Sequence, residues 1–285
     1  MDKNLKDIVI IYHDQCRDGF GSAYAAWKKF GDKADYLPLK TQAKPPGGLT
    51  GREIYILDYS FDKDNLQKLV DQNKSVLVID HHRSTEEAVT SFPANIFDKN
   101  HSGAVLSWKY FHPNTATPPL LEYIEDHDLW QFKLPNNREY NVALSQYPTT
   151  FEDWDRLVED LKNEQFLSEY LKKGAIISKF EDKLVENLLQ YKERVLFEGH
   201  EIWALNVART YRSILGHHLA TINEKSGGVA FGVVYYRNNG GVHLSLRSNG
   251  DFDVSEIAVK YGGRGHKNAA SIRVDSFTDL PFTFL

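Results

Sequence analysis

The sequence has little of several features that large classes of protein need. It contains one cysteine, Cys16, so an internal disulfide cannot form and a disulfide-stabilised secreted domain is excluded. Its longest apolar runs, such as Ile8–Ile11 and Val76–Ile79, are far too short to cross a bilayer. The opening stretch, residues 1–7, is charged and lacks the apolar core of a signal peptide. We therefore expect a cytoplasmic protein with no membrane partner.

Positively charged residues are also outnumbered by negatively charged ones. Lysine and arginine number 34 against 39 aspartates and glutamates, so the formal net charge is −5. We do not expect such a chain to bind long nucleic acid by non-specific electrostatic attraction. An anionic ligand would instead need a local cluster of cations or a bound metal ion.

The chain nevertheless has the composition of a folded protein, with 41% hydrophobic and 26% charged residues in 285. At about 100–200 residues per domain, this length indicates two domains. Apolar runs at residues 7–13, 52–58 and 75–80 predict strands, and helices are expected at 19–30, 64–70 and 105–111. Strands that alternate with helices predict parallel βαβ units.

The pattern changes after residue 150. Residues 151–195 are expected to be helical throughout, with Gly174 either separating two helices or lying in one kinked helix. Beyond them we expect strands at 201–207, 229–237 and 242–247, a turn at 238–241, and helices at 211–222 and 252–261. The fold class is therefore α/β, with a parallel-sheet domain over 1–150, a helical connector over 151–197 and a smaller α/β domain over 198–285.

Ionisable residues follow the predicted strands of the first domain. His13, Asp58 and Asp80–His82 stand at three strand ends, and Glu125–Asp128 is interpreted as a fourth site at the same sheet edge, where ligands bind in parallel sheets. Carboxylates and imidazoles without thiolate clusters suit manganese, magnesium or iron, and several aspartates could hold two ions. A single aspartate at a strand end is more often a helix cap or a loop residue, but four such sites at one sheet edge are hard to explain in that way.

Two further features could bind a ligand. The stretch 261–270 is glycine-rich, and its amides could form an anion nest reinforced by a following helix, although a plain turn is an equal alternative. His266, Lys267 and Arg247 would add donors there. Trp130 follows Asp128 closely and could wall the site or stack a base, although a core role is the more common one.

These residues resemble a known family. Asp80-His81-His82 at the end of an apolar strand resembles the signature of the DHH phosphoesterases, and GGRGHKNAAS (262–271) resembles the GGGH motif of the associated DHHA1 domain. The resemblance implies a DHH catalytic domain with a binuclear site for two divalent cations, Mn²⁺ or alternatively Mg²⁺, and a DHHA1 domain that binds substrate across a cleft. Activities known in the family include exonucleases, short-oligonucleotide hydrolases, nucleotide 3′-phosphatases, cyclic dinucleotide phosphodiesterases and polyphosphatases.

The same resemblance assigns roles to individual residues. It implies metal ligation by His13, Asp18, Asp58, His81 and Asp128, with Asp126 as the alternative to Asp128. Asp58 would bridge both ions, and Asp80 and His82 would support the ligands or the phosphate. Substrate phosphate would be bound by Arg247, Ser248, Gly262, Gly263, Arg264, Gly265 and His266.

Two positions depart from the family pattern. Cys16 stands where the first motif has its first aspartate, and we expect its thiol to lie near the metals without strong ligation. Arg264 replaces the third glycine of the second motif.

We therefore expect a metal-dependent phosphodiesterase or exonuclease that cuts short single-stranded oligonucleotides or small nucleotide phosphodiesters with a water activated by two metals. The alternatives are a nucleotide 3′-phosphatase, a polyphosphatase and, from another class, a nucleotide sensor without catalysis. The expected partner is a short nucleic acid or nucleotide, and a homodimer is left open.

Overall fold

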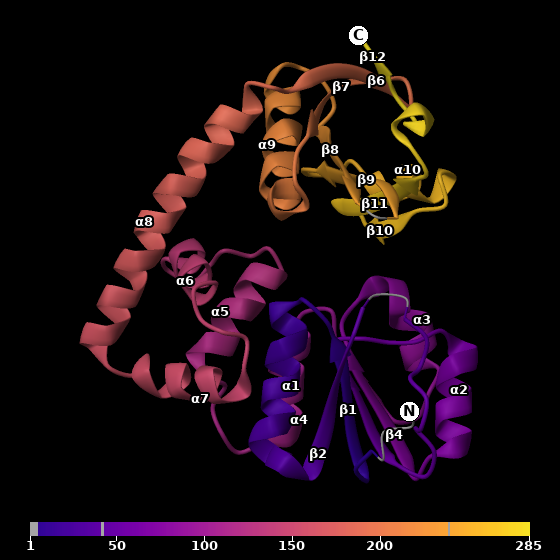
Figure 1. Cartoon of the computed structure of the whole chain (residues 1–285), viewed down its shortest axis with the longest axis vertical. Helices are drawn as coiled ribbons and strands as arrows, with labels where there is room; N and C mark the ends of the chain where they lie inside the picture. Colours follow the sequence, from indigo (N-terminus) through magenta and orange to yellow (C-terminus); the bar gives the residue numbers. More distant parts are fainter. Residues whose placement is uncertain (1–4, 41–42, 239) are drawn as a thin grey trace. The chain divides into compact units, whose positions relative to one another are not determined.

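The computed structural model describes residues 5–40, 43–238 and 240–285, and its contacts divide the chain into two units, Met1–Ser178 and Lys179–Leu285. Figure 1 traces the elements of each unit along the chain. The division falls within one long helix. The expected segments 1–150, 151–197 and 198–285 remain a prediction.

The first unit is built on a five-stranded parallel sheet in the order β2-β1-β3-β4-β5. The alternation of β1 explains how this sheet is covered, because Ile10 faces one hydrophobic core while Val9 and Ile11 face another. Helices α1 and α4 lie on the first face and α2 and α3 on the second (Figure 1). The strands are β1 (Ile8–His13), β2 (Ala34–Leu39), β3 (Glu53–Leu57), β4 (Ser75–Asp80) and β5 (Asn95–Phe97).

The helices of this unit supply most of the apolar side chains that bury the sheet. Each fully buried leucine or isoleucine contributes roughly 1.5–3 kcal/mol, so both layers stabilise the strands whose ends carry the ionisable residues. The helices are α1 (Arg17–Phe30), α2 (Lys63–Gln72), α3 (Glu86–Thr90), α4 (Gly103–Phe111), α5 (Pro119–Asp128), α6 (Asn137–Leu144), α7 (Phe151–Asp160) and α8 (Glu164–Leu189).

β1, β3 and β4 are at the positions predicted from the sequence, whereas the two edge strands of this sheet were not predicted. β2 contains Pro38, which weakens a strand pattern and is tolerated because an edge strand leaves one side of its backbone unpaired. β5 has three residues, too few for a periodic signal.

The prediction that residues 151–195 are helical throughout was wrong in two places. The chain turns between α7 and α8 at residues 161–163, and β6 begins at Glu193. Gly174 does not separate two helices, because α8 runs through it. A Cβ at that position would lie 2.0 Å from the carbonyl oxygen of Glu139, so the glycine lets α8 pack closely against α6.

The second unit contains a seven-stranded mixed sheet in the order β10-β11-β9-β8-β7-β6-β12. The expected pairing of β8 with β9 is present, while Asn239 of their turn lies outside the described residues. Four strands of this sheet were not predicted from the sequence: β6, β10, β11 and β12. The elements are β6 (Glu193–Phe197), β7 (His200–Asn206), α9 (Arg212–Lys225), β8 (Phe231–Asn238), β9 (Gly241–Ser248), α10 (Val254–Lys260), β10 (Arg264–His266), β11 (Ala269–Val274) and β12 (Thr283–Phe284).

The α/β fold class is thus confirmed, with a parallel sheet in the first unit and a second sheet in the other. None of the helices in the described part of the chain is both long and apolar enough to cross a membrane.

Candidate functional site

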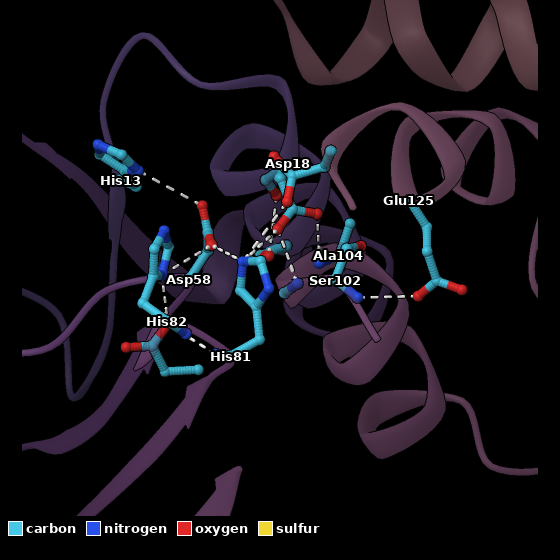
Figure 2. Close-up of polar contacts among 12 residues, drawn as sticks. His13, Asp18, Asp58, His81, His82, Ser102, Ala104 and Glu125 are labelled. Carbon is cyan, nitrogen blue, oxygen red and sulfur yellow. Dashed lines mark hydrogen bonds and ion pairs between the residues drawn. The ribbon is translucent and has the colours of Figure 1, made fainter. Parts of the chain in front are cut away.

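Three neighbouring strand ends bring the first group of site residues together. In the parallel sheet Tyr12 pairs with Leu57, and Leu57 pairs with Ile79. The next residues are His13, Asp58 and Asp80, so they leave the sheet at the same level. Figure 2 shows His13, Asp58, His81 and His82 around one point at this edge.

Asp58 lies at the centre of this group. Its side chain is 1% exposed, with Oδ2 3.5 Å from His13 Nδ1 and Oδ1 3.2 Å from His81 Nε2. Within the described structure, neither carboxylate oxygen has a hydrogen bond of acceptable geometry, and Asp58 has a left-handed backbone with φ of 50°. Buried polar atoms are rarely left without a partner, so an orphaned carboxylate facing imidazoles fits a site for a cation.

His81 links this carboxylate to a second acidic pair. Its Nε2 atom lies 3.5 Å from Asp18 Oδ2 and 3.6 Å from Asp128 Oδ2, and this nitrogen is likewise buried without a hydrogen bond among the residues described. Imidazole nitrogen between carboxylate oxygens is a typical ligand arrangement for a divalent ion.

The possible ligand atoms form three overlapping groups. In each group every ligand atom lies within 4.8 Å of the others, and Asp58 and His81 each belong to two groups. The donor set fits a divalent cation. The groups are Asp58, Asp80, His81 and His82; His13, Cys16 and Asp58; and Asp18, His81 and Asp128.

Asp18 is fixed by the start of helix α4. Its Oδ2 accepts a hydrogen bond from Gly103 N at 2.7 Å, and its Oδ1 accepts one from Ala104 N at 2.9 Å. A Cβ on Gly103 would lie 2.6 Å from Asp58 Cβ, so only glycine lets the helix approach both carboxylates. Gly103 was not predicted from the sequence as a site residue. Its signal is a small pair, Ser102-Gly103, directly before an apolar helix.

Asp80 stabilises the turn that contains His81 and His82. Its Oδ1 accepts hydrogen bonds from His81 N at 2.8 Å, His82 N at 3.3 Å and His82 Nδ1 at 2.7 Å, and its Oδ2 accepts one from Thr85 Oγ1 at 2.6 Å. The Asp80 side chain is fully buried. Its contacts therefore orient His82 and fix the turn.

The structure separates the two candidates on helix α5. Asp126 is 5% exposed and accepts hydrogen bonds from Lys133 N, Leu134 N and Asn137 Nδ2, so it holds the following loop. Asp128 joins the cluster instead. Asp128 is the last residue of α5, so this fourth site is supplied by a helix end and not by a strand.

The close approach of carboxylates and imidazoles shifts the pKa values of the cluster. Burial lowers the pKa of His81, but Asp58 and the nearby carboxylates outweigh it and raise the pKa to about 10. Burial likewise lowers the pKa of His82, while the bond to Asp80 raises it to about 9. Burial and the charge of Asp58 raise the pKa of Asp18. For Asp58, burial raises the pKa, but contacts with His13 and His81 hold it below its usual range. A divalent cation would replace the proton that His81 retains.

Cys16 precedes helix α1 and makes no side-chain cap there. Burial, followed by the charges of Asp58, Asp128 and Asp18, raises the pKa of its thiol well above the usual value. Its Sγ lies within 4.8 Å of possible ligand atoms of His13 and Asp58. Whether the thiol binds metal remains a prediction.

The second unit carries a pair of arginines. Arg247 donates to Leu246 O at 2.8 Å and to Ser213 Oγ at 3.2 Å. Burial, with Arg212 nearby, lowers the pKa of Arg247 to about 10. Among the residues described, no carboxylate forms an ion pair with either guanidinium, so the pair fits an anion. Arg212 was missed because it stands outside any motif, at the first residue of α9.

The glycine-rich stretch of this unit is a turn before a β-hairpin. The expected helix after it was wrong, because β10 and β11 follow. A Cβ on Gly263 would lie 2.1 Å from Ser271 O, while Gly262 and Gly265 have φ of 69° and 157°. Only the backbones of Arg264 and His266 are described. Ser248 Oγ donates to Phe252 O at 2.7 Å. Phosphate binding by these residues remains a prediction.

No protein-family model matches the chain. It is 25% identical to the uncharacterized protein R106 of Acanthamoeba polyphaga mimivirus over 296 residues, covering 96% of this chain and 69% of R106. It is 23% identical to oligoribonuclease NrnB of Bacillus subtilis, covering 78% of this chain and 59% of NrnB. It is 24% identical to a 3′,5′-cyclic-nucleotide phosphodiesterase of Helicobacter pylori, covering 78% of this chain and 74% of the relative.

Solved structures share the fold. The DHH domain of a member of a family of ribosomal proteins aligns with a TM-score of 0.58 at 11% identity, covering 95% of this chain and 83% of the other. PggH, a pGpG-specific phosphodiesterase of Vibrio cholerae, aligns with a TM-score of 0.53 at 14% identity, covering 95% and 94%. The sequence relatives and the shared fold together confirm that the chain resembles the DHH-type phosphoesterases.

Proposed function

We propose that this protein is a divalent-metal-dependent phosphodiesterase that hydrolyses short single-stranded oligonucleotides or small nucleotide phosphodiesters. The observation that carries the proposal is the buried Asp58 carboxylate, which has no hydrogen bond among the described residues and faces imidazoles of His13 and His81. Relatives named as an oligoribonuclease and a cyclic-nucleotide phosphodiesterase support nucleotide phosphodiesters as the substrate class.

The ligands of the proposed ions are His13, Asp18, Asp58, His81 and Asp128. Mn²⁺ is the proposed ion, because oxygen and imidazole donors dominate the set. Bound divalent cations supply Lewis-acid stabilisation of the phosphoryl oxygens and make water a stronger nucleophile at neutral pH.

His82 is the proposed proton donor to the leaving oxygen. Its Nδ1 is 2.7 Å from Asp80 Oδ1, which leaves Nε2 as the ring nitrogen able to give up a proton. Asp80 fixes the tautomer and orientation of this imidazole. Burial lowers the pKa of His82, while the bond to Asp80 raises it and favours the protonated ring that this role requires.

Arg247 and Arg212 are the proposed binding groups for a substrate phosphate in the second unit. Two guanidiniums without a carboxylate partner in the described structure repel one another, and an anion relieves that repulsion. The net charge of −5 agrees with a substrate that has few phosphates and is held by such local cations.

The test compares dinucleotides, cyclic dinucleotides, nucleotide 3′,5′-bisphosphates and polyphosphate as substrates with Mn²⁺ present. We expect the dinucleotides to be cleaved fastest, and Asp58→Asn to abolish turnover and reduce bound manganese while the circular dichroism spectrum stays unchanged. Asp62→Asn, at an exposed carboxylate that caps α2, is the matched control. Nucleotide binding without hydrolysis would favour a sensor, and release of phosphate from polyphosphate alone would overturn the substrate class.

A further inference from the structure

Two large aromatic side chains are exposed directly after helix α5. Trp130 is 53% exposed and Phe132 is 43% exposed. Their ring centroids lie 4.7 Å apart in an edge-to-face arrangement, and the ring of His127 lies 6.0 Å from the first and 5.5 Å from the second. We call these three rings the ring cluster. Aromatic side chains contribute most to stability when buried, so exposure of two together points to a ligand.

The backbone that presents these rings is strained and firmly held. Trp130 and Phe132 have left-handed conformations with φ of 57° and 50°, which bulky residues rarely adopt. The buried Asp126 carboxylate accepts hydrogen bonds from Lys133 N at 2.8 Å and Leu134 N at 3.0 Å. Its carbonyl oxygen accepts another from Gln131 N at 2.9 Å. These hydrogen bonds hold the loop that carries the two exposed rings, although its left-handed backbone conformations are energetically unfavourable.

The ring cluster adjoins the candidate metal centre. Asp128, whose Oδ2 is 3.6 Å from His81 Nε2, precedes Trp130 by two residues. Two residues of chain span at most about 7 Å. The rings themselves carry no carboxylate, ammonium or guanidinium group, so their faces suit a flat, uncharged ligand better than a phosphate.

We propose that Trp130 and Phe132 stack a nucleobase of the substrate beside the phosphodiester that is cleaved. The proposal rests on the proposed function and adds that the enzyme recognises the base as well as the phosphate. Every base has an aromatic face, so stacking tolerates different bases and requires only that one be present. The pair would thus favour nucleotide substrates over phosphoesters without a base.

The experiment compares a dinucleotide with the same dinucleotide in which one base is replaced by hydrogen, an abasic analogue, in the presence of Mn²⁺. Trp130→Ala should lower kcat/KM for the dinucleotide by about 5- to 150-fold, the range of one base–aromatic stack. It should leave kcat/KM for the abasic analogue unchanged, and Trp130→Phe should restore most of the loss. Tyr110→Ala, at a 42% exposed aromatic on α4, is the matched control and should change neither.

A binding measurement separates failure of this proposal from failure of the proposed function. In EDTA, calorimetric titration should show tighter binding of the dinucleotide than of the abasic analogue, and Trp130→Ala should remove the difference. Equal losses on both substrates, or equal binding of both ligands by the unchanged protein, would overturn the stacking role. If the unchanged protein hydrolyses neither substrate, the proposed function is wrong, and the binding comparison alone decides whether the rings hold a base.

Discussion

Removal of the Asp80 carboxylate should both destabilise the protein and weaken its metal site. The side chain is fully buried and accepts four hydrogen bonds, three on Oδ1 and one on Oδ2. At about 1.5–3 kcal/mol for each bond to a charged group, the sum is about 6–12 kcal/mol. That sum is an upper bound, because His82 is 27% exposed and can regain water. Breaking one partner of a buried ionic pair costs about 3–5 kcal/mol, and we expect Asp80→Ala to fall in that range.

Asp80→Asn removes the charge of this side chain but keeps its shape. An amide oxygen in place of Oδ1 keeps its three donors, and the amide nitrogen can donate to Thr85 Oγ1 once that hydroxyl rotates. The loss of unfolding free energy should therefore be about 1–2 kcal/mol. Asp80→Ala should also bind Mn²⁺ more weakly, by about 10–100-fold, because His81 and His82 lose their orientation.

Urea denaturation followed by circular dichroism measures the stability change, and manganese titration followed by electron paramagnetic resonance measures the affinity. Asp62→Asn, which removes a charge from an exposed helix cap, is the control and should leave metal affinity unchanged. A loss below about 1 kcal/mol in Asp80→Ala with unaltered manganese affinity would refute the reasoning, because it would mean that the turn holds the histidines without this carboxylate.

The remaining predictions concern the cations and the thiol. The pKa of His81 is raised to about 10 from an ordinary 6.5, so its protonated form stabilises the metal-free protein fully below pH 6.5, and this stabilisation is lost as the pH rises towards 10. Manganese should accordingly raise Tm more at pH 9 than at pH 6.5, and an equal gain at both would contradict the assignment. Cys16→Ser should keep most manganese-dependent activity and Cys16→Asp should bind manganese equally or more tightly, as activity titrations would show; inactive but folded Cys16→Ser would instead make the thiol a required ligand. Arg212→Ala and Arg247→Ala should each lower kcat/KM by about 10–100-fold at unchanged metal content, unlike Arg237→Ala on an exposed strand end, and loss of metal in either would refute their role as phosphate contacts.

The sequence was sufficient to predict the central strands and the residues at their ends. β1, β3 and β4 have apolar runs long enough to show a pattern, and the rule for parallel sheets then places His13, Asp58 and Asp80 at one edge. It could not predict the edge strands, whose short or proline-containing sequences carry little periodicity.

Contacts between distant segments were the other limit. Gly103 approaches Asp58 and Asp18 across the sheet edge, and the close fit depends on three-dimensional packing that no spacing in the chain encodes. The different surroundings of Asp126 and Asp128 also needed the structure, because both are carboxylates on one helix. Asp126 accepts a hydrogen bond from Lys133 N, whereas Asp128 lies 3.6 Å from His81 Nε2. Arg212 could not be identified from the sequence either, because its proposed role in binding an anion depends on its proximity to Arg247.

The left-handed backbone at Asp58 restricts which substitutions the chain can accept at that position over evolutionary time. Asparagine, aspartate and glycine adopt a φ near 50° with little strain, whereas most other residues pay roughly 1–2 kcal/mol for it. A lineage that lost the need for catalysis would therefore drift first to asparagine or glycine here, and only later to larger residues. An aspartate at this position in a distant homologue would indicate that selection still acts on its charge. Asparagine and glycine, which are uncharged, can adopt the same backbone conformation.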